Sequence, residues 1–275
     1  MSTVTLDAEL DRERTRGHGG RAATVAGRLA TRSLILIPRV PSTFVPSLIF
    51  PVFSTIAFSG AFSALVAVPG FPPGIKMIDW ILPMTIVQGA AFAGLTTGLG
   101  VARDLEGGFF DRLLLAPVRP IALIAGPMLA AVLRAFVPVA IVLPVGLLFG
   151  ARLRGGVVGG SLMLLIAAEG AAVIAGGWAV GLALRIKSMK AAALMQVGIF
   201  ITIFLSTAQV PLAVMTGWLH QVARFNPTTN ILALSRQGFV GHVTWAQTWP
   251  GLVAIVAGIA VLGGFAVRGL RSVTP

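Results

Sequence analysis

The sequence predicts an all-α integral membrane protein with six transmembrane helices and an amphipathic helix on the membrane surface before them. The chain has 275 residues, of which 56% are hydrophobic and only 11% are charged, whereas soluble domains carry roughly 25% charged residues. So few charges cannot cover a soluble surface, but a membrane protein needs few because lipid covers most of its outside. Six long segments almost free of charge reach the ~20 residues that cross a bilayer.

The six segments define the transmembrane domain, which we place at residues 41–275. Four contain no charged residue, the third contains only Arg134, and the fourth contains only Glu169. An external segment at 214–247 separates the last two helices. We expect the membrane helices at residues 44–66, 80–102, 120–149, 157–184, 191–213 and 248–267.

Basic residues set the predicted orientation. If the N-terminus is cytoplasmic, most of the 21 Lys and Arg residues fall in cytoplasmic segments. The positive-inside rule therefore predicts both termini in the cytoplasm of a multi-pass protein of the inner (plasma) membrane. Arg152 and Arg154, in a predicted external loop, are a local exception. This spread of charge along the chain also argues against nucleic acid as a partner, despite the net charge of +12.

The segment before the first membrane helix has its own pattern. Residues 1–20 mix charges with glycines and are expected to be a disordered cytoplasmic tail. Within residues 21–40, Arg21, Arg28 and Arg32 share one helical face, which favours an amphipathic helix on the membrane surface. The alternative for this stretch is a frayed basic tail.

The most informative segment is 103–117, between the second and third membrane helices. Leu105, Phe109 and Leu113 are spaced i, i+4, i+8, on one side of a helix. An ordinary solvated loop is the alternative, but exposed apolar side chains in such number favour a partner or the membrane surface. The candidate contact residues are Arg103, Asp104, Leu105, Glu106, Phe109, Phe110, Asp111, Arg112 and Leu113.

Three motifs carry a resemblance to a known family. Residues 106–118 read acidic-x-Gly-x-x-Asp-Arg-Leu-Leu-x-Ala-Pro-Val, which resembles the cytoplasmic segment of ABC-2 type permeases, the membrane subunits of ABC exporters. Residues 210–236, with Asn226-Pro227, resemble the external segment of daunorubicin-resistance-type permeases. The approach to the first membrane helix is similar too, with an Arg-rich surface helix, Pro41 and then Phe50-Pro51.

The resemblance implies a six-helix half-transporter of the ABC-2 exporter type. Residues 21–40 would then be its connecting helix, and 103–117 would be a coupling helix that contacts a separate ABC ATPase, present in two copies. A second permease, identical or homologous, would complete the path within the membrane lipid. ATP and Mg would bind the ATPase, and this chain would bind no cofactor and would not itself be an enzyme.

The sequence has no phosphate-binding loop of the form G-x-x-x-x-G-K-[ST]. Its nearest approach is Lys187-Ser188, with Gly181 six residues before the lysine, but Ile186 stands where the second glycine is needed. We therefore expect a partner to supply ATP binding.

Two charges lie near the middle of predicted membrane helices. Arg134 and Glu169 are on consecutive antiparallel helices, and charged residues in membranes usually pair or face water. We hypothesise that they form an ion pair or line a polar cavity, in either a structural or a transport role.

Four polar residues in the membrane helices are candidates for the substrate path. Such residues also serve as contacts between helices, and this alternative stays open. The residues are Gln88, Gln196, Thr202 and Gln209.

The apolar path predicts a hydrophobic or amphipathic substrate, such as a drug, a lipid or a glycolipid. One alternative is a secondary transporter or channel without an ATPase, for which Glu169 is the available membrane carboxylate. A lipid-modifying enzyme is another, but its site would need His, Asp or Glu clustered at one membrane face. The three histidines are too scattered to form a metal site.

Overall fold

The computed structural model describes residue 27, residue 31 and residues 41–110 and 120–272. The predicted tail (1–20), most of the predicted surface helix (21–40) and residues 111–119 lie outside the described residues. The described elements are α2 (Pro41–Ala61), η1 (Ser63–Ala67), α3 (Met77–Glu106), α5 (Pro120–Leu148), α6 (Val157–Ile186), α7 (Ala191–Phe204), η2 (Leu212–Val214), α8 (Gly217–Phe225), α9 (Pro227–Val240) and α10 (Trp245–Arg271).

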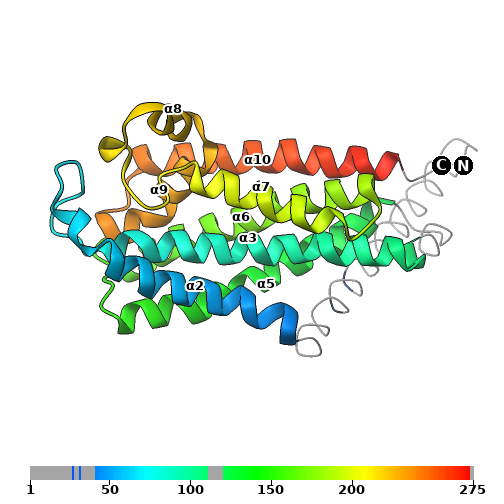
Figure 1. The fold of residues 1–275 in the computed structure, drawn as a ribbon, viewed down its shortest axis with the longest axis horizontal. Coiled ribbons are helices and arrows are strands. Elements are labelled where there is room, and N and C mark those ends of the chain that lie inside the picture. Colours follow the sequence, from blue (N-terminus) through cyan, green and yellow to red (C-terminus); the bar gives the residue numbers. More distant parts are fainter. Residues whose placement is uncertain (1–26, 28–30, 32–40, 111–119, 273–275) are drawn as a thin grey trace, which may run out of the picture.

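The long helices run side by side along the long axis of the molecule (Figure 1). Within the described residues, α3, α5, α6 and α10 are long and apolar enough to cross a membrane. They match four of the six predicted spans. We call the two ends of this bundle the Glu106 end, where α3 finishes, and the Lys76 end, where α3 begins.

Helix α3 is the central helix, because it packs against α2, α5, α6 and α9. Its contact with α6 is close because glycines face it. A Cβ on Gly94 would lie 2.1 Å from the carbonyl oxygen of Ala172, and one on Gly98 would lie 2.3 Å from the Cβ of Ala179. The small-residue spacing Gly94-x-x-x-Gly98 therefore brings two membrane helices into backbone contact.

The prediction of a membrane helix at 191–213 is wrong at its end, because α7 stops at Phe204. Fourteen residues make a helix of about 21 Å, which is shorter than the ~30 Å hydrocarbon core. Side chains from a later segment replace the missing helical hydrogen bonds. Asn226 Nδ2 donates to the carbonyls of Thr202 (2.7 Å) and Leu205 (2.9 Å).

The first predicted helix, 44–66, is also shorter at its end: α2 finishes at Ala61 and a short 3-10 helix follows. The predicted external segment, 214–247, is itself helical. Its second helix, α9, packs into the bundle against α3, α6 and α10, and Leu232, Leu234 and Phe239 are fully buried. The first, α8, lies at the outside of the Lys76 end (Figure 1).

Candidate functional site

The segment predicted to contact an ATPase begins at the last turn of α3. Arg103 and Glu106 are exposed there, whereas Phe110 is 3% exposed. Gly108 has a φ of 66°, a conformation that glycine adopts without strain, and it turns the chain after α3. Leu105 and Phe109 therefore do not share one continuous helix, which corrects that part of the prediction. Asp111, Arg112 and Leu113 lie outside the described residues.

Glu106 joins this segment to the turn between α6 and α7. Its Oε1 accepts hydrogen bonds from the Ser188 hydroxyl at 2.6 Å and from the backbone N–H of Met189 at 2.8 Å. A 30-residue helix is about 45 Å long, so the exposed Glu106 extends past a ~30 Å hydrocarbon core. The Ser188 and Met189 donors hold the pKa of this carboxyl below its ordinary value, because they favour its charged form.

Helix α10 is joined to the same end through Arg185 of α6. The Nη1 atom of Arg185 donates to the carbonyl of Phe265 at 3.0 Å, and its guanidinium lies 3.7 Å from the centre of the Phe265 ring. Together with the Glu106 contacts, this connects α3, α6, α7 and α10 near one end of the bundle.

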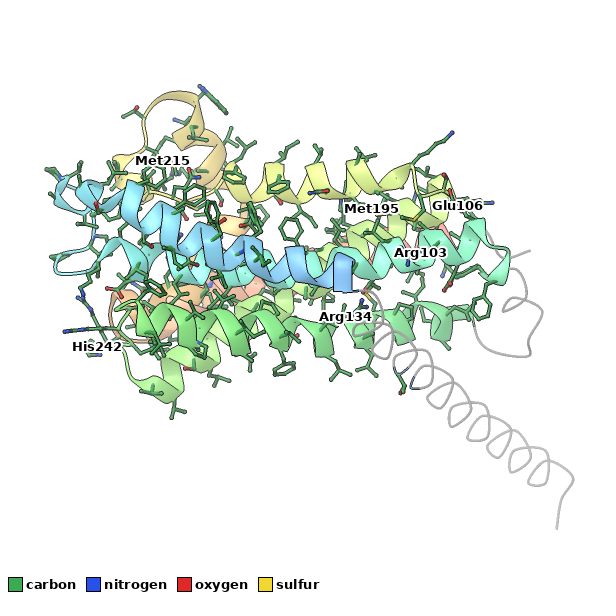
Figure 2. The ribbon with its side chains drawn as sticks, turned by 60° about the horizontal axis from the view of Figure 1, so that its bottom comes forward. Arg103, Glu106, Arg134, Met195, Met215 and His242 are labelled. Atoms are coloured by element: carbon green, nitrogen blue, oxygen red, sulfur yellow. The ribbon has the colours of Figure 1, made fainter. Side chains whose placement is uncertain are left out.

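Arg134 turns toward α3 and does not meet Glu169. Its guanidinium donates to the hydroxyls of Thr96 and Thr97, each at 2.9 Å, and to the carbonyl of Ala130 at 3.0 Å. Figure 2 places Arg134 in the half of the bundle nearer the Glu106 end. Both carboxylate oxygens of Glu169 are buried without a hydrogen-bond partner among the described residues. Arg134 and Glu169 therefore do not form the ion pair that the sequence suggested. The guanidinium of Arg134 instead donates its hydrogen bonds to hydroxyl groups of α3.

Of the four candidate path residues, Thr202 lines a cavity. This apolar cavity has a volume of about 560 Å³ and lies between α3, α6, α7, α9 and α10. Gln88 is 1% exposed in α3, and Gln196 faces outward on α7. Gln209 is partly exposed in the chain after α7. The structure thus does not bring these four side chains together.

Two charged residues at the Lys76 end were not singled out from sequence. Arg236 of α9 is 3% exposed, and it donates to the carbonyls of Trp80 (3.0 Å), Thr207 (2.7 Å) and Ala208 (2.6 Å). It thereby supplies partners for the irregular backbone after α7.

Asp79 is the second of these residues and is fully buried. Its carboxylate accepts from the backbone N–H of Lys76 (2.9 Å) and of Arg152 (2.8 Å), and it pairs with the guanidinium of Arg154 at 3.3 Å. It therefore fastens the start of α3 to the loop between α5 and α6.

The family model of the ABC-2 type transporter matches residues 25–240. The chain belongs to the ABC-2 type transporter family. It is also 28% identical, over 221 aligned residues, to the daunorubicin resistance ABC transporter permease protein DrrB1 of Streptomyces coeruleorubidus, covering 76% of this chain and 74% of that protein.

Membership of the ABC-2 family confirms the resemblance drawn from residues 106–118 and 210–236. Permeases of this family work with a separate ATPase subunit and are not themselves enzymes. The chain is thus a multi-pass membrane protein of the transporter class.

Proposed function

We propose that the chain is the membrane-spanning permease subunit of an ATP-driven exporter in the plasma membrane. Two copies of a separate ATPase would hydrolyse ATP, and a second permease, identical or homologous, would complete the path. The Glu106 end and both termini would face the cytoplasm. Membership of the ABC-2 family supports this proposal, as does the similarity to a drug-resistance permease.

One observation carries the proposal: Glu106, the last residue of the central helix, is exposed and is hydrogen-bonded to the α6–α7 turn. A force on this segment would act on α3, which is buried along most of its length. The glycine contacts of Gly94 and Gly98 would pass that movement to α6, because close-packed backbones do not slide independently. ATP binding by the partner would in this way re-orient the helices toward the outside.

The substrate in this proposal is hydrophobic or amphipathic, such as a drug, a lipid or a glycolipid. The cavity at Thr202 has an apolar lining that includes Ile199, Ile231 and Ala254. Apolar cavities of this size suit small-molecule ligands. The similar Streptomyces protein is named for resistance to daunorubicin.

Cysteine crosslinking tests the ATPase contact directly, because the chain contains no cysteine. Arg103→Cys carries a photo-reactive maleimide at the Glu106 end, and Lys76→Cys carries the same label at the opposite end. In native membranes we expect Arg103→Cys to crosslink to a soluble ATPase and Lys76→Cys to give no such product. Equal crosslinking from both positions, or none from either, would contradict the proposal.

Glu169 supports a second candidate, an ion-coupled transporter without an ATPase. Its buried carboxylate oxygens have no partner among the described residues, and such groups in membranes often serve proton or ion relays. This candidate predicts transport that follows an ion gradient, persists without ATP and is abolished by Glu169→Gln. Transport that requires ATP and survives Glu169→Gln would exclude it.

A further inference from the structure

The apolar cavity near Thr202 offers a ligand few polar contacts. Its walls include Val87 of α3, Ala171 of α6 and Ile231 of α9, all buried. Two of the polar groups in the lining are already bonded within the protein. Thr202 donates to the carbonyl of Ile199 at 3.0 Å, and the Trp178 indole donates to the carbonyl of Met195 at 3.3 Å. The ligand that suits this cavity is therefore a hydrocarbon.

The mouth of the cavity opens on the outer surface of the bundle. Ile201 of α7 and Val261 of α10 both line the cavity, and they are 52% and 68% exposed. Other large apolar side chains on these outer faces are exposed as well: Leu194, Val197, Val253 and Val256. Surfaces of this kind on membrane helices face lipid. The medium in contact with the mouth is thus the hydrocarbon of the bilayer.

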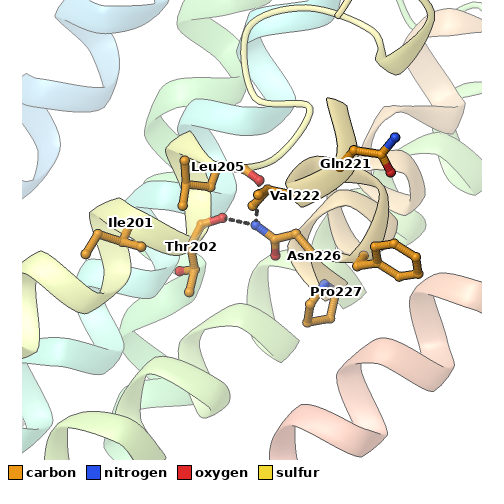
Figure 3. Close-up of a pocket in the computed structure, with 8 residues that line it drawn as sticks. Ile201, Thr202, Leu205, Gln221, Val222, Asn226 and Pro227 are labelled. Carbon is orange, nitrogen blue, oxygen red and sulfur yellow. Dashed lines mark hydrogen bonds between the residues drawn. The ribbon is translucent and has the colours of Figure 1, made fainter. Parts of the chain in front are cut away.

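A second cavity, of about 530 Å³, continues from the first toward α8. The two share Ile201, Thr202 and Pro227 in their linings. Figure 3 shows this second cavity, where Asn226 bonds to the backbone of α7 and Gln221 stands at the side of α8. Because they share these three residues, the two cavities adjoin, and we take them together as one path from α8 toward the interior.

Helix α8 has the features of a helix that lies at the membrane–water interface. Trp218 and Phe225 are 70% and 80% exposed, and the polar residues Gln221 and Arg224 are also exposed. A short helix with large apolar side chains and a polar side settles at the boundary between headgroups and acyl chains. The path therefore begins at headgroup level and ends in an apolar chamber.

We propose that these joined cavities bind one acyl chain of a membrane phospholipid. The headgroup lies beside α8 near Gln221, and the tail passes Thr202 into the chamber lined by Trp178 and Ala254. The tail moves from the apolar bilayer into an apolar cavity, so bound lipid exchanges with bilayer lipid. The lipid that occupies the cavity therefore reflects the lipid composition of the membrane. This inference concerns lipid binding alone and does not depend on export activity.

Trp178 reports on the chamber because it lines it. We would replace Trp218, Trp245 and Trp249 by Phe and keep Trp80, which lies under Arg236. Fluorescence is measured in phosphatidylcholine vesicles with and without bromine on the acyl chains, in this background and in the same background with Trp178→Phe. The difference in fluorescence between the two backgrounds is the signal of Trp178. We expect brominated lipid to quench this signal, and to quench it more strongly as the mole fraction of brominated lipid rises.

A plug at the mouth supplies the matched control. Ala257 lines the cavity and is exposed, whereas Ala260, one turn along α10, is exposed and is not in the lining. Ala257→Phe is expected to remove most of the Trp178 quenching, and Ala260→Phe is expected to leave it unchanged. Thermal unfolding of both variants verifies that they fold as the parent does.

Three results would overturn the proposal. Equal quenching in the two alanine variants would mean that the bromines reach Trp178 from outside the cavity. Quenching of Trp178 by acrylamide but not by brominated lipid would mean that water fills the chamber. Protection from both quenchers would mean that protein, such as a second copy of this chain, covers the mouth.

Discussion

Glu106, at the end of α3, and Ser188, in the α6–α7 turn, are joined by a hydrogen bond of 2.6 Å although 82 residues separate them. Helix α3 continues into the segment proposed to meet the ATPase, whereas the turn leads into α7, which borders both cavities. The bond thus connects the proposed site of energy input with the proposed site of binding.

Removal of this bond is expected to weaken the coupling of ATP hydrolysis to transport. Glu106→Ala should reduce ATP-dependent export severalfold and leave the amount of bound ATPase unchanged. Glu106→Gln should have a smaller effect, because an amide oxygen can still accept from Ser188 and Met189. Export assays in vesicles check both variants, with exposed Arg271→Ala as the control. Full export by Glu106→Ala would show that the bond has no part in coupling.

The glycine contacts between α3 and α6 are expected to tolerate no added methyl group. Gly94→Ala and Gly98→Ala each place a Cβ within 2.3 Å of α6, and overpacking of this kind costs about 1–3 kcal/mol. Gly100→Ala, in the same helix, meets nothing within 4 Å and should be neutral or stabilising by up to ~1 kcal/mol. Thermal unfolding in detergent compares the three, and equal stability would refute the close contact.

Arg236 is expected to be essential for the fold around the end of α7. Lysine cannot reach the carbonyls of Trp80, Thr207 and Ala208 with one planar group. Loss of charge-assisted bonds costs about 1.5–3 kcal/mol each, so Arg236→Lys should lower the unfolding temperature clearly. The exposed Arg224→Lys in α8 is the matched control. An unchanged unfolding temperature would argue against these bonds.

Arg134 and Glu169 are expected to act independently. Residues in direct contact show interaction energies of about 0.5–3 kcal/mol in double-mutant cycles, and separate ones add. Stability measurements should therefore find coupling between Arg134→Gln and Thr97→Val. The effects of Arg134→Gln and Glu169→Gln should sum. Strong coupling between Arg134→Gln and Glu169→Gln would mean that these two residues form an ion pair, which would contradict the structure.

The sequence predicted the long helices well because their signal is local. Apolar runs of membrane length identified α3, α5, α6 and α10. The end of α7 could not be predicted in this way. The helix stops at Phe204, where Asn226, more than 20 residues later in the chain, binds the carbonyls of Thr202 and Leu205. Arg236 binds the carbonyls of Thr207 and Ala208 in the irregular backbone that follows.

The detail of the candidate site at the Glu106 end could not be predicted from the sequence. The motif at 106–118 indicated a coupling segment, yet the bond from Glu106 to Ser188 depends on the packing of α3 against α6. Helical spacing placed Leu105 and Phe109 on one face, but the positive φ of Gly108 breaks that face. Proximity in the membrane suggested that Arg134 meets Glu169, and the nearer hydroxyls of Thr96 and Thr97 take the guanidinium instead.

The central claim is that this ABC-2 permease contacts a separate ATPase through the segment that follows α3. Affinity purification of the tagged chain from native membranes, with mass spectrometry of the bound proteins, tests it most directly. We predict a stoichiometric soluble ATPase that is lost in the folded variants Phe109→Asp and Leu113→Asp and retained in Arg224→Asp, at the opposite end. A stable permease with no ATPase bound would contradict the account and would make Glu169 the next residue to test.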